Sequence, residues 1–206
     1  MTRVDPISPE AERSLRTLNR LAVLLHRGRP AFAGVSPWHL ESRQDLNEAV
    51  IVRAFSVLEA YLLDRADELL VQELPVPGSP SPLVAYLYDV VLSQFRTRFE
   101  TRVEFWKNAL GVDLRSGYPK WSKVSEHKDL RNTLTHALGY MHPRRYERIP
   151  KSVRARLARV TATPELYMGR IPIDDRDADD SIEVAKDVIQ WLERSRPHRV
   201  RMGVAP

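Results

Sequence analysis

The 206-residue chain contains no cysteine. This absence excludes a disulfide-stapled scaffold, a thiolate zinc site and a cysteine nucleophile, and it favours a reducing compartment. Long apolar runs are also missing: runs such as Leu21 to Leu25 and Ala49 to Val52 fall far short of the roughly 20 residues that span a bilayer. No apolar stretch follows Arg3 as in a secretory signal. We therefore expect a cytoplasmic protein without a membrane segment.

Glycine is scarce, with 8 residues, and none forms the spacing of a phosphate-binding or dinucleotide-binding loop. The acidic stretch 174–180 lacks the glycine at position six and the glutamate at position twelve that a calcium loop requires, so we interpret it as a solvated loop that caps the last helix. His127, His136 and His142 are nine and six residues apart, which is not zinc-ligand spacing. The sequence predicts neither a metal nor a cofactor.

Helical periodicity dominates what is present. With 43% hydrophobic and 29% charged residues, the composition is that of a globular protein, and we expect one domain over residues 1–206. The predicted fold class is all-α: an antiparallel bundle of four to five main helices with a small irregular appendage before the last helix. For residues 165–173 within that appendage, a short hairpin is one interpretation. Helices are predicted over 9–27, 41–74, 83–110, 121–138 and 150–160, followed by a last helix beginning at the Asp180–Glu183 cap.

The helix over 121–138 has two unlike faces. Leu130, Leu134 and Ala137 fall on one arc, which we expect to pack on the other helices. The opposite arc is polar, and we expect it to be open to solvent. It consists of Ser125, Lys128, Asp129, Asn132 and His136, with Arg131 on its flank.

This polar arc carries a recognisable pattern: Arg131 is followed by Asn132 and, after four intervening positions, by His136 near the end of the helix. The pattern resembles the signature of the HEPN superfamily. Arg20 and His26 have a similar spacing, but only the later pair has the asparagine, the outward face and a closing Gly139. Residues 53–64 also resemble the Leu-Glu-bearing helix that packs beside the motif in that family. The resemblance covers about residues 47–140 and implies a helical domain that cleaves or binds RNA.

The resemblance also assigns roles that fit the chemistry of the side chains. His136 would perform acid–base catalysis, since a histidine pKa near 6.5 suits proton transfer. Arg131 would hold the scissile phosphate, and Asn132 would orient the histidine or bind a non-bridging oxygen. An ordinary surface histidine near a helix C-terminus is the alternative for His136. Family members paired with a nucleotidyltransferase antitoxin carry tyrosine two residues after the histidine, where this chain has Leu138.

Two further residues near the pattern have open roles. Glu59 on a mostly apolar helix is interpreted as a rim residue, or as the partner of a nearby arginine such as Arg53 or Arg131, rather than as a catalytic acid. Tyr140 lies four residues after His136, too late for the position of the family's tyrosine, and we assign it no role.

Positive charge is concentrated directly after the polar arc. The chain has 26 Arg, 6 Lys and a formal charge of +5, and residues 142–159 contain seven basic residues and one acid, with Tyr140 and Tyr146 at the entry. Arginines beside aromatic rings are typical of surfaces that bind single-stranded nucleic acid, and a solvated basic helix is the alternative. The RNA-binding candidates are Lys128, Arg144, Arg145, Arg148, Lys151, Arg154, Arg156 and Arg159.

The sequence therefore predicts a metal-independent endoribonuclease that cleaves single-stranded RNA through attack of its 2′-hydroxyl, in the role of a bacterial toxin or conflict-system effector. Its expected partners are RNA, a second copy whose polar arc faces the first to form a shared site, and an antitoxin protein. A non-catalytic HEPN-type module that binds RNA or protein is the first alternative. A plain helical interaction protein, in which the motif is accidental, is the second.

Overall fold

The computed structural model describes residues 7–34, 36–73, 98–137, 143–159 and 161–195, together with the helical positions Pro82, Tyr86, Val90 and Ser93. Within this part of the chain no strand forms, and the all-α prediction is confirmed. None of the described helices is long and apolar enough to cross a membrane. The α-helices are α1 Pro9–Gly28, α2 Pro37–Glu73, α4 Phe99–Leu110, α5 Leu114–Gly117, α6 Trp121–Ala137, α7 Lys151–Leu157 and α8 Asp175–Arg194. The 3-10 helices are η1 Arg29–Phe32, η2 Pro143–Arg148 and η3 Pro164–Leu166.

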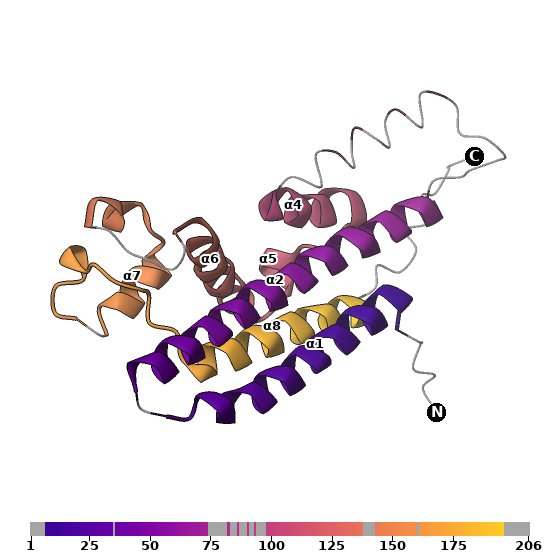
Figure 1. Cartoon of the computed structure of the whole chain (residues 1–206). Coiled ribbons are helices and arrows are strands. Elements are labelled where there is room, and N and C mark those ends of the chain that lie inside the picture. Colours follow the sequence, from indigo (N-terminus) through magenta and orange to yellow (C-terminus); the bar gives the residue numbers. More distant parts are fainter. Residues whose placement is uncertain are drawn as a thin grey trace, which may run out of the picture.

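Three long helices, α1, α2 and α8, lie side by side and form the main body of the bundle (Figure 1). Their directions follow from contacts at the two ends. At one end, Ser8 before α1 meets Glu193 at the end of α8; at the other, Arg29 after α1 meets Asp179 near the start of α8. Helix α1 is therefore antiparallel to α8, whereas α2 runs in the same direction as α8.

A buried carboxylate joins these three helices where α8 ends. Glu193 accepts hydrogen bonds from the backbone and hydroxyl of Ser8 and from Tyr61 Oη, each at 2.8 Å, and pairs with Arg65 at 3.2 Å. Burial alone would raise the pKa of Glu193, but these hydrogen bonds and the arginine charge hold it below its ordinary value. The carboxylate is thus satisfied inside the bundle and fixes the register of its three main helices.

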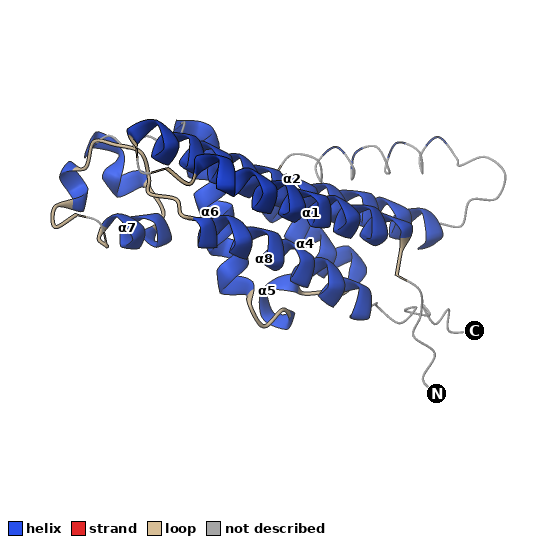
Figure 2. Ribbon diagram, turned by 60° about the horizontal axis from the view of Figure 1, so that its bottom comes forward, coloured by secondary structure: helices blue, strands red, loops and turns tan. Residues whose placement is uncertain are grey.

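Helices α4, α5 and α6 cover the side of α2 and α8 that faces away from α1 (Figures 1 and 2). Trp106 of α4 is fully buried, and its indole Nε1 donates to the carbonyl of Leu62 in α2 at 3.1 Å. Helix α7 packs on α6 at one end of the molecule. The prediction that Leu130 and Leu134 of α6 face the core is confirmed.

The start of α1 and the end of α4 follow local sequence signals. Ser8 Oγ caps α1 by accepting from the backbone N–H of Ala11 at 3.2 Å, with Pro9 at the first helical position, as predicted. Gly111 ends α4 with a φ of 69°, a left-handed conformation that favours glycine. Both boundaries lie where the sequence predicts them.

The predicted start of the last helix is wrong. Helix α8 begins at Asp175, and the acidic stretch 174–180 forms its cap and first turns instead of a solvated loop. Asp174 and Asp177 form a reciprocal capping box, and Asp175 pairs with Arg29 and Arg43. Acidic side chains at a helix N-terminus are favourable, and the arginines offset their mutual repulsion.

The predicted continuous helix over 83–110 is also wrong, because Arg98 is extended and α4 begins at Phe99. The Phe99 side chain is buried, and its ring centre lies 5.1 Å from that of Phe55 and 6.1 Å from that of Trp121. The upstream positions Leu87, Val91 and Phe95 lie outside the described residues.

Two smaller predictions differ from the structure. The stretch 165–173 forms no hairpin: Tyr167 Oη donates to the carbonyl of Arg170 at 2.8 Å, and Gln44 of α2 donates to that of Ile171 at 2.9 Å. Side chains thus satisfy two of the carbonyl groups in this stretch. The expected loop around Gly117 instead contains α5, capped by Asp113.

Candidate functional site

Arg131 projects from α6 toward α2, and its guanidinium contacts two side chains. Nη2 donates to Glu59 Oε2 and Nη1 donates to Asn132 Oδ1, each at 2.9 Å. The guanidinium carbon lies 6.0 Å from the centre of the Phe55 ring. The side chain is 24% exposed, and within the described part of the chain its buried Nε has no hydrogen-bond partner. Arg131 is therefore held in a fixed pose, and part of its surface stays open to solvent.

The contact with Arg131 fixes the orientation of Asn132. An arginine only donates hydrogen bonds, so the amide oxygen must be the atom that faces Nη1. The Nδ2 group, with its two N–H donors, is then left for an acceptor. Position 136 follows one helical turn later on the same face of α6. Asn132 thus connects the arginine to the face that carries His136, whose side chain lies outside the described residues.

Glu59 joins three helices at this site. Its Oε2 accepts from Arg131 of α6, and its Oε1 lies 3.2 Å from Arg102 Nη1 of α4. The carboxylate is mostly buried between the two guanidinium groups. The interpretation of Glu59 as an ion-pair partner of Arg131 is confirmed. Sequence reasoning missed Arg102, because no local pattern indicates a contact between residues 43 positions apart.

The predicted open polar arc on α6 is in fact half-buried. Lys128 donates to Glu100 of α4 at 2.6 Å, and Asp129 accepts from Ser152 of α7 at 3.2 Å. The expectation of an open, fully solvated arc is wrong, because α4 and α7 pack beside it. Lys128 is also not a free cation for RNA, since Glu100 neutralises it.

A second histidine of α6, His127, is buried one turn before Arg131 and is 5% exposed. Its Nδ1 is buried and has no hydrogen-bond partner among the residues that the structure describes. Burial lowers the pKa of His127, and the Arg156 charge acts in the same direction, whereas Glu126, Asp180 and Asp177 oppose the shift. His127 is therefore a neutral core residue at neutral pH.

The basic segment after α6, residues 142–159, contains exposed side chains and side chains that contact other parts of the fold. Arg148, Lys151 and Arg159 are exposed. Arg154 is partly buried and lies 5.8 Å from the Tyr146 ring centre. The side chains of Arg144 and Arg145, with Tyr140 and His142, lie outside the described residues.

Arg156, one of the RNA-binding candidates, is held by two carboxylates within the fold. Its side chain is 14% exposed and bridges Asp177 of α8 and Glu126 of α6. This pair joins α7 to the start of α8, so it belongs to the fold. No local pattern in the sequence indicates these ion pairs, because the acids lie 21 and 30 residues away.

The arrangement suits binding of an anion more than binding of a metal. Within the described ranges, no group of three or more histidine, aspartate or glutamate side chains could hold a metal ion. Arg131 and Asn132 together offer donors at one place on α6. Comparisons with protein-family models, with curated proteins and with solved structures give no match for this chain.

Proposed function

We propose that the chain is a HEPN-type endoribonuclease that cleaves single-stranded RNA without a metal ion. The observation that carries this proposal is the hydrogen bond from Arg131 to Asn132, one helical turn before His136. This contact supports the proposal that Arg131 and Asn132 donate to a phosphate beside position 136 of the same helix. In this role the protein acts as a cytoplasmic toxin or conflict-system effector, controlled by an antitoxin protein.

The reaction needs only the RNA and these side chains. His136 takes the proton of the ribose 2′-hydroxyl, and the 2′-oxygen forms a bond to phosphorus while the bond from phosphorus to the 5′-oxygen breaks. Water protonates the departing 5′-oxygen. Arg131 and the Nδ2 group of Asn132 stabilise the charge that grows on the non-bridging oxygens. The products are a 2′,3′-cyclic phosphate and a 5′-hydroxyl.

The chemical test is cleavage of a labelled single-stranded RNA by the purified protein in EDTA. We expect a 2′,3′-cyclic phosphate product, and no cleavage where the ribose at the cut site is 2′-deoxy. His136→Ala should lower the rate by about 10² to 10⁴ with unchanged thermal unfolding. The matched control is His26→Ala, since Arg20 and His26 form the other pair of similar spacing. Equal rates for wild type and His136→Ala would refute the assignment.

The arginine is tested separately, because its charge is also structural. Arg131→Lys keeps a cation near Glu59 but does not reproduce the planar donor fork through which Arg131 contacts Glu59 and Asn132. We expect a loss of kcat with little loss of stability. An unchanged kcat would show that Arg131 does not hold the phosphate.

The exposed cations Arg148, Lys151 and Arg159 are proposed to contact the RNA backbone. Each neutralised phosphate of a single strand contributes about −0.7 to the slope of log affinity against log salt. Changing all three residues to Gln should flatten that slope by up to about two units for any RNA sequence. Arg156→Gln is the matched control, because its side chain is already bound to Asp177. An unchanged slope in the triple variant would show that the segment does not bind RNA.

The premise of a site shared between two copies was an open polar arc, and that premise is wrong. We therefore propose that each chain carries its own Arg131, Asn132 and His136. Mixing Arg131→Ala chains with His136→Ala chains should then restore no activity. Partial recovery in the mixture would instead show that the two copies share one site.

A specific observation favours the alternative of a non-catalytic binding module. The Arg131 charge is already neutralised by Glu59, as in a structural ion pair. If that is its role, Arg131→Ala lowers thermal stability, RNA binds through the basic segment, and no preparation cleaves RNA in the assay above. The two functions thus give opposite results in one experiment.

A further inference from the structure

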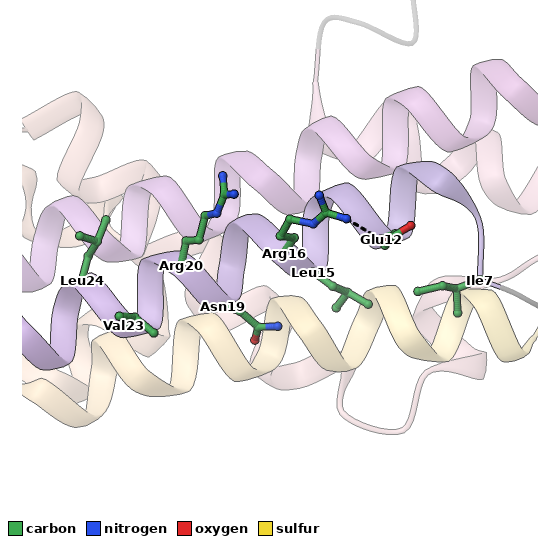
Figure 3. Close-up of a pocket in the computed structure, with 8 residues that line it drawn as sticks. All are labelled: Ile7, Glu12, Leu15, Arg16, Asn19, Arg20, Val23 and Leu24. Carbon is green, nitrogen blue, oxygen red and sulfur yellow. Dashed lines mark hydrogen bonds and ion pairs between the residues drawn. The ribbon is translucent and has the colours of Figure 1, made fainter.

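Helix α1 lies on the side of the bundle away from α6 (Figure 1), and it carries exposed apolar side chains. Ile7, Val23 and Leu24 are 48%, 49% and 65% exposed. They line an open hollow of about 640 Å³ along the helix (Figure 3). The other residues that line it are Glu12, Leu15, Arg16, Asn19 and Arg20.

The order of apolar and charged residues along this face suits a contact with a second copy of the same face that runs in the opposite direction. Ile7 lies at one end of the hollow, and Val23 and Leu24 lie at the other (Figure 3). The charges follow the same order, with acidic Glu12 in the first half and basic Arg20 in the second. The apolar ends and the charged pair are both centred on the same place, at Leu15 and Arg16.

We propose that this face is where a second copy of the chain binds, with its α1 antiparallel to the first about a two-fold axis at Leu15 and Arg16. In this arrangement the apolar end of one face covers the opposite apolar end of the other, because an isologous contact pairs each residue with its counterpart across the axis. Glu12 of each copy faces Arg20 of the other. The opposed directions of the two helices are also favourable for their dipoles.

The ion pair between Arg16 and Glu12 within one chain is compatible with a contact between Glu12 and Arg20 of the other copy. Arg16 Nη2 donates to Glu12 Oε1 at 2.5 Å, which leaves Oε2 of the same carboxylate for Arg20 of the other copy. The Glu12 carboxylate also lies between the two Arg16 side chains near the axis and offsets their repulsion. The hollow thus presents an acceptor in one half and a donor in the other.

The size of the face sets the expected strength of the dimer. The stretch from Ile7 to Leu24 is about 26 Å long at 1.5 Å per residue. One helix face of this length buries less surface than the roughly 800 Å² per partner of a standard interface. We therefore expect a reversible dimer whose population rises over roughly 1 to 100 μM protein. Because α6 faces the other way, this dimer leaves the two candidate sites apart.

Sedimentation equilibrium with a charge exchange tests the proposal. Wild type should approach twice 23.7 kDa as the protein concentration rises. Glu12→Arg and Arg20→Glu alone should each weaken association at least about tenfold, because like charges then face each other at two symmetric places. The double variant E12R/R20E restores opposite charges, and its Kd should return to within about threefold of wild type.

Two more variants complete the test. Leu24→Asp should abolish the dimer, since it places a charge in the apolar contact. Arg13→Glu is the matched control: it is exposed on the same helix, changes the charge as Arg20→Glu does, and lies outside the hollow. A monomer at all concentrations would overturn the proposal. So would a double variant no tighter than the single ones, or a dimer that responds to Asn132→Arg and not to Leu24→Asp, which would place the interface on α6.

Discussion

Replacing His127 should remove a pH dependence of folding stability near neutrality. Burial lowers the pKa of this side chain in the folded protein below the ordinary 6.5. Above pH 6.5 the histidine is neutral in both states and has no effect. Below it the unfolded chain binds a proton that the folded protein does not, so stability falls as pH falls toward the folded pKa.

The magnitude follows from the linkage relation. One proton bound only by the unfolded chain gives a slope of about 1.4 kcal/mol per pH unit. Wild type should therefore lose roughly 1 kcal/mol of unfolding free energy between pH 7.5 and 5.5. His127→Phe, which also removes the unpartnered Nδ1, should lack this loss. The pKa values of Glu193 and Asp175 are lowered, so these two carboxylates change the stability only below about pH 4.5, outside the range from pH 7.5 to 5.5.

The measurement is urea unfolding followed by circular dichroism at fixed protein concentration. His26→Gln, at an exposed position of α1, is the control and should keep the wild-type slope. One group acts in the opposite direction: burial and Glu68 raise the pKa of Glu10, so its contribution is lost as pH rises above 4.5. For this reason the unfolding free energies of wild type and His127→Phe are compared at each pH, and their difference tests the argument. Equal slopes in these two proteins would refute the argument.

Three further substitutions probe the fold. Asp175→Asn should lower the free energy of unfolding by about 2 kcal/mol, because it weakens charged hydrogen bonds that hold the start of α8. Wild type should keep that stability until the pH falls below about 4, since the pKa of Asp175 is lowered to about 2. Gly111→Ala should cost about 1 kcal/mol from its positive φ alone, because no other atom lies within 4 Å of the added carbon; urea unfolding measures both changes. Arg156→Gln should lower thermal stability, because it removes the ion pair with Asp177 that connects α7 to α8. RNA affinity, measured by fluorescence anisotropy, should stay as in wild type.

Features with a local cause could be predicted from the sequence. The cap at Ser8, the stop at Gly111 and the apolar side of α6 each depend on residues within one or two helical turns. The interpretation of Glu59 as an ion-pair partner is also confirmed, because a mostly buried carboxylate is stable when a cation pairs with it.

Features that depend on distant residues could not be predicted. Five aspartates in seven residues have low helix propensity, and they become the start of α8 only because Arg29, Arg43 and Arg156 arrive from other helices. The same contacts remove Arg156 from the set of exposed cations. An arginine that binds a carboxylate and one that awaits a phosphate look alike in a sequence, since both need the same donor group.

Helix α6 carries both the buried His127 and the candidate site, so the pH dependence of activity requires its own control. A loss of cleavage on acidification is expected if His136 is the catalytic base, but the loss of stability that His127 causes would also weaken the packing of α6 one turn before Arg131. His127→Phe separates the two causes, because it removes only the buried proton site. If His136 is the base, the variant should keep the fall in kcat between pH 7.5 and 5.5 while losing the fall in stability. If the fall in kcat disappears together with the fall in stability, the acid-sensitive step is the packing of α6, and the pH profile then says nothing about His136.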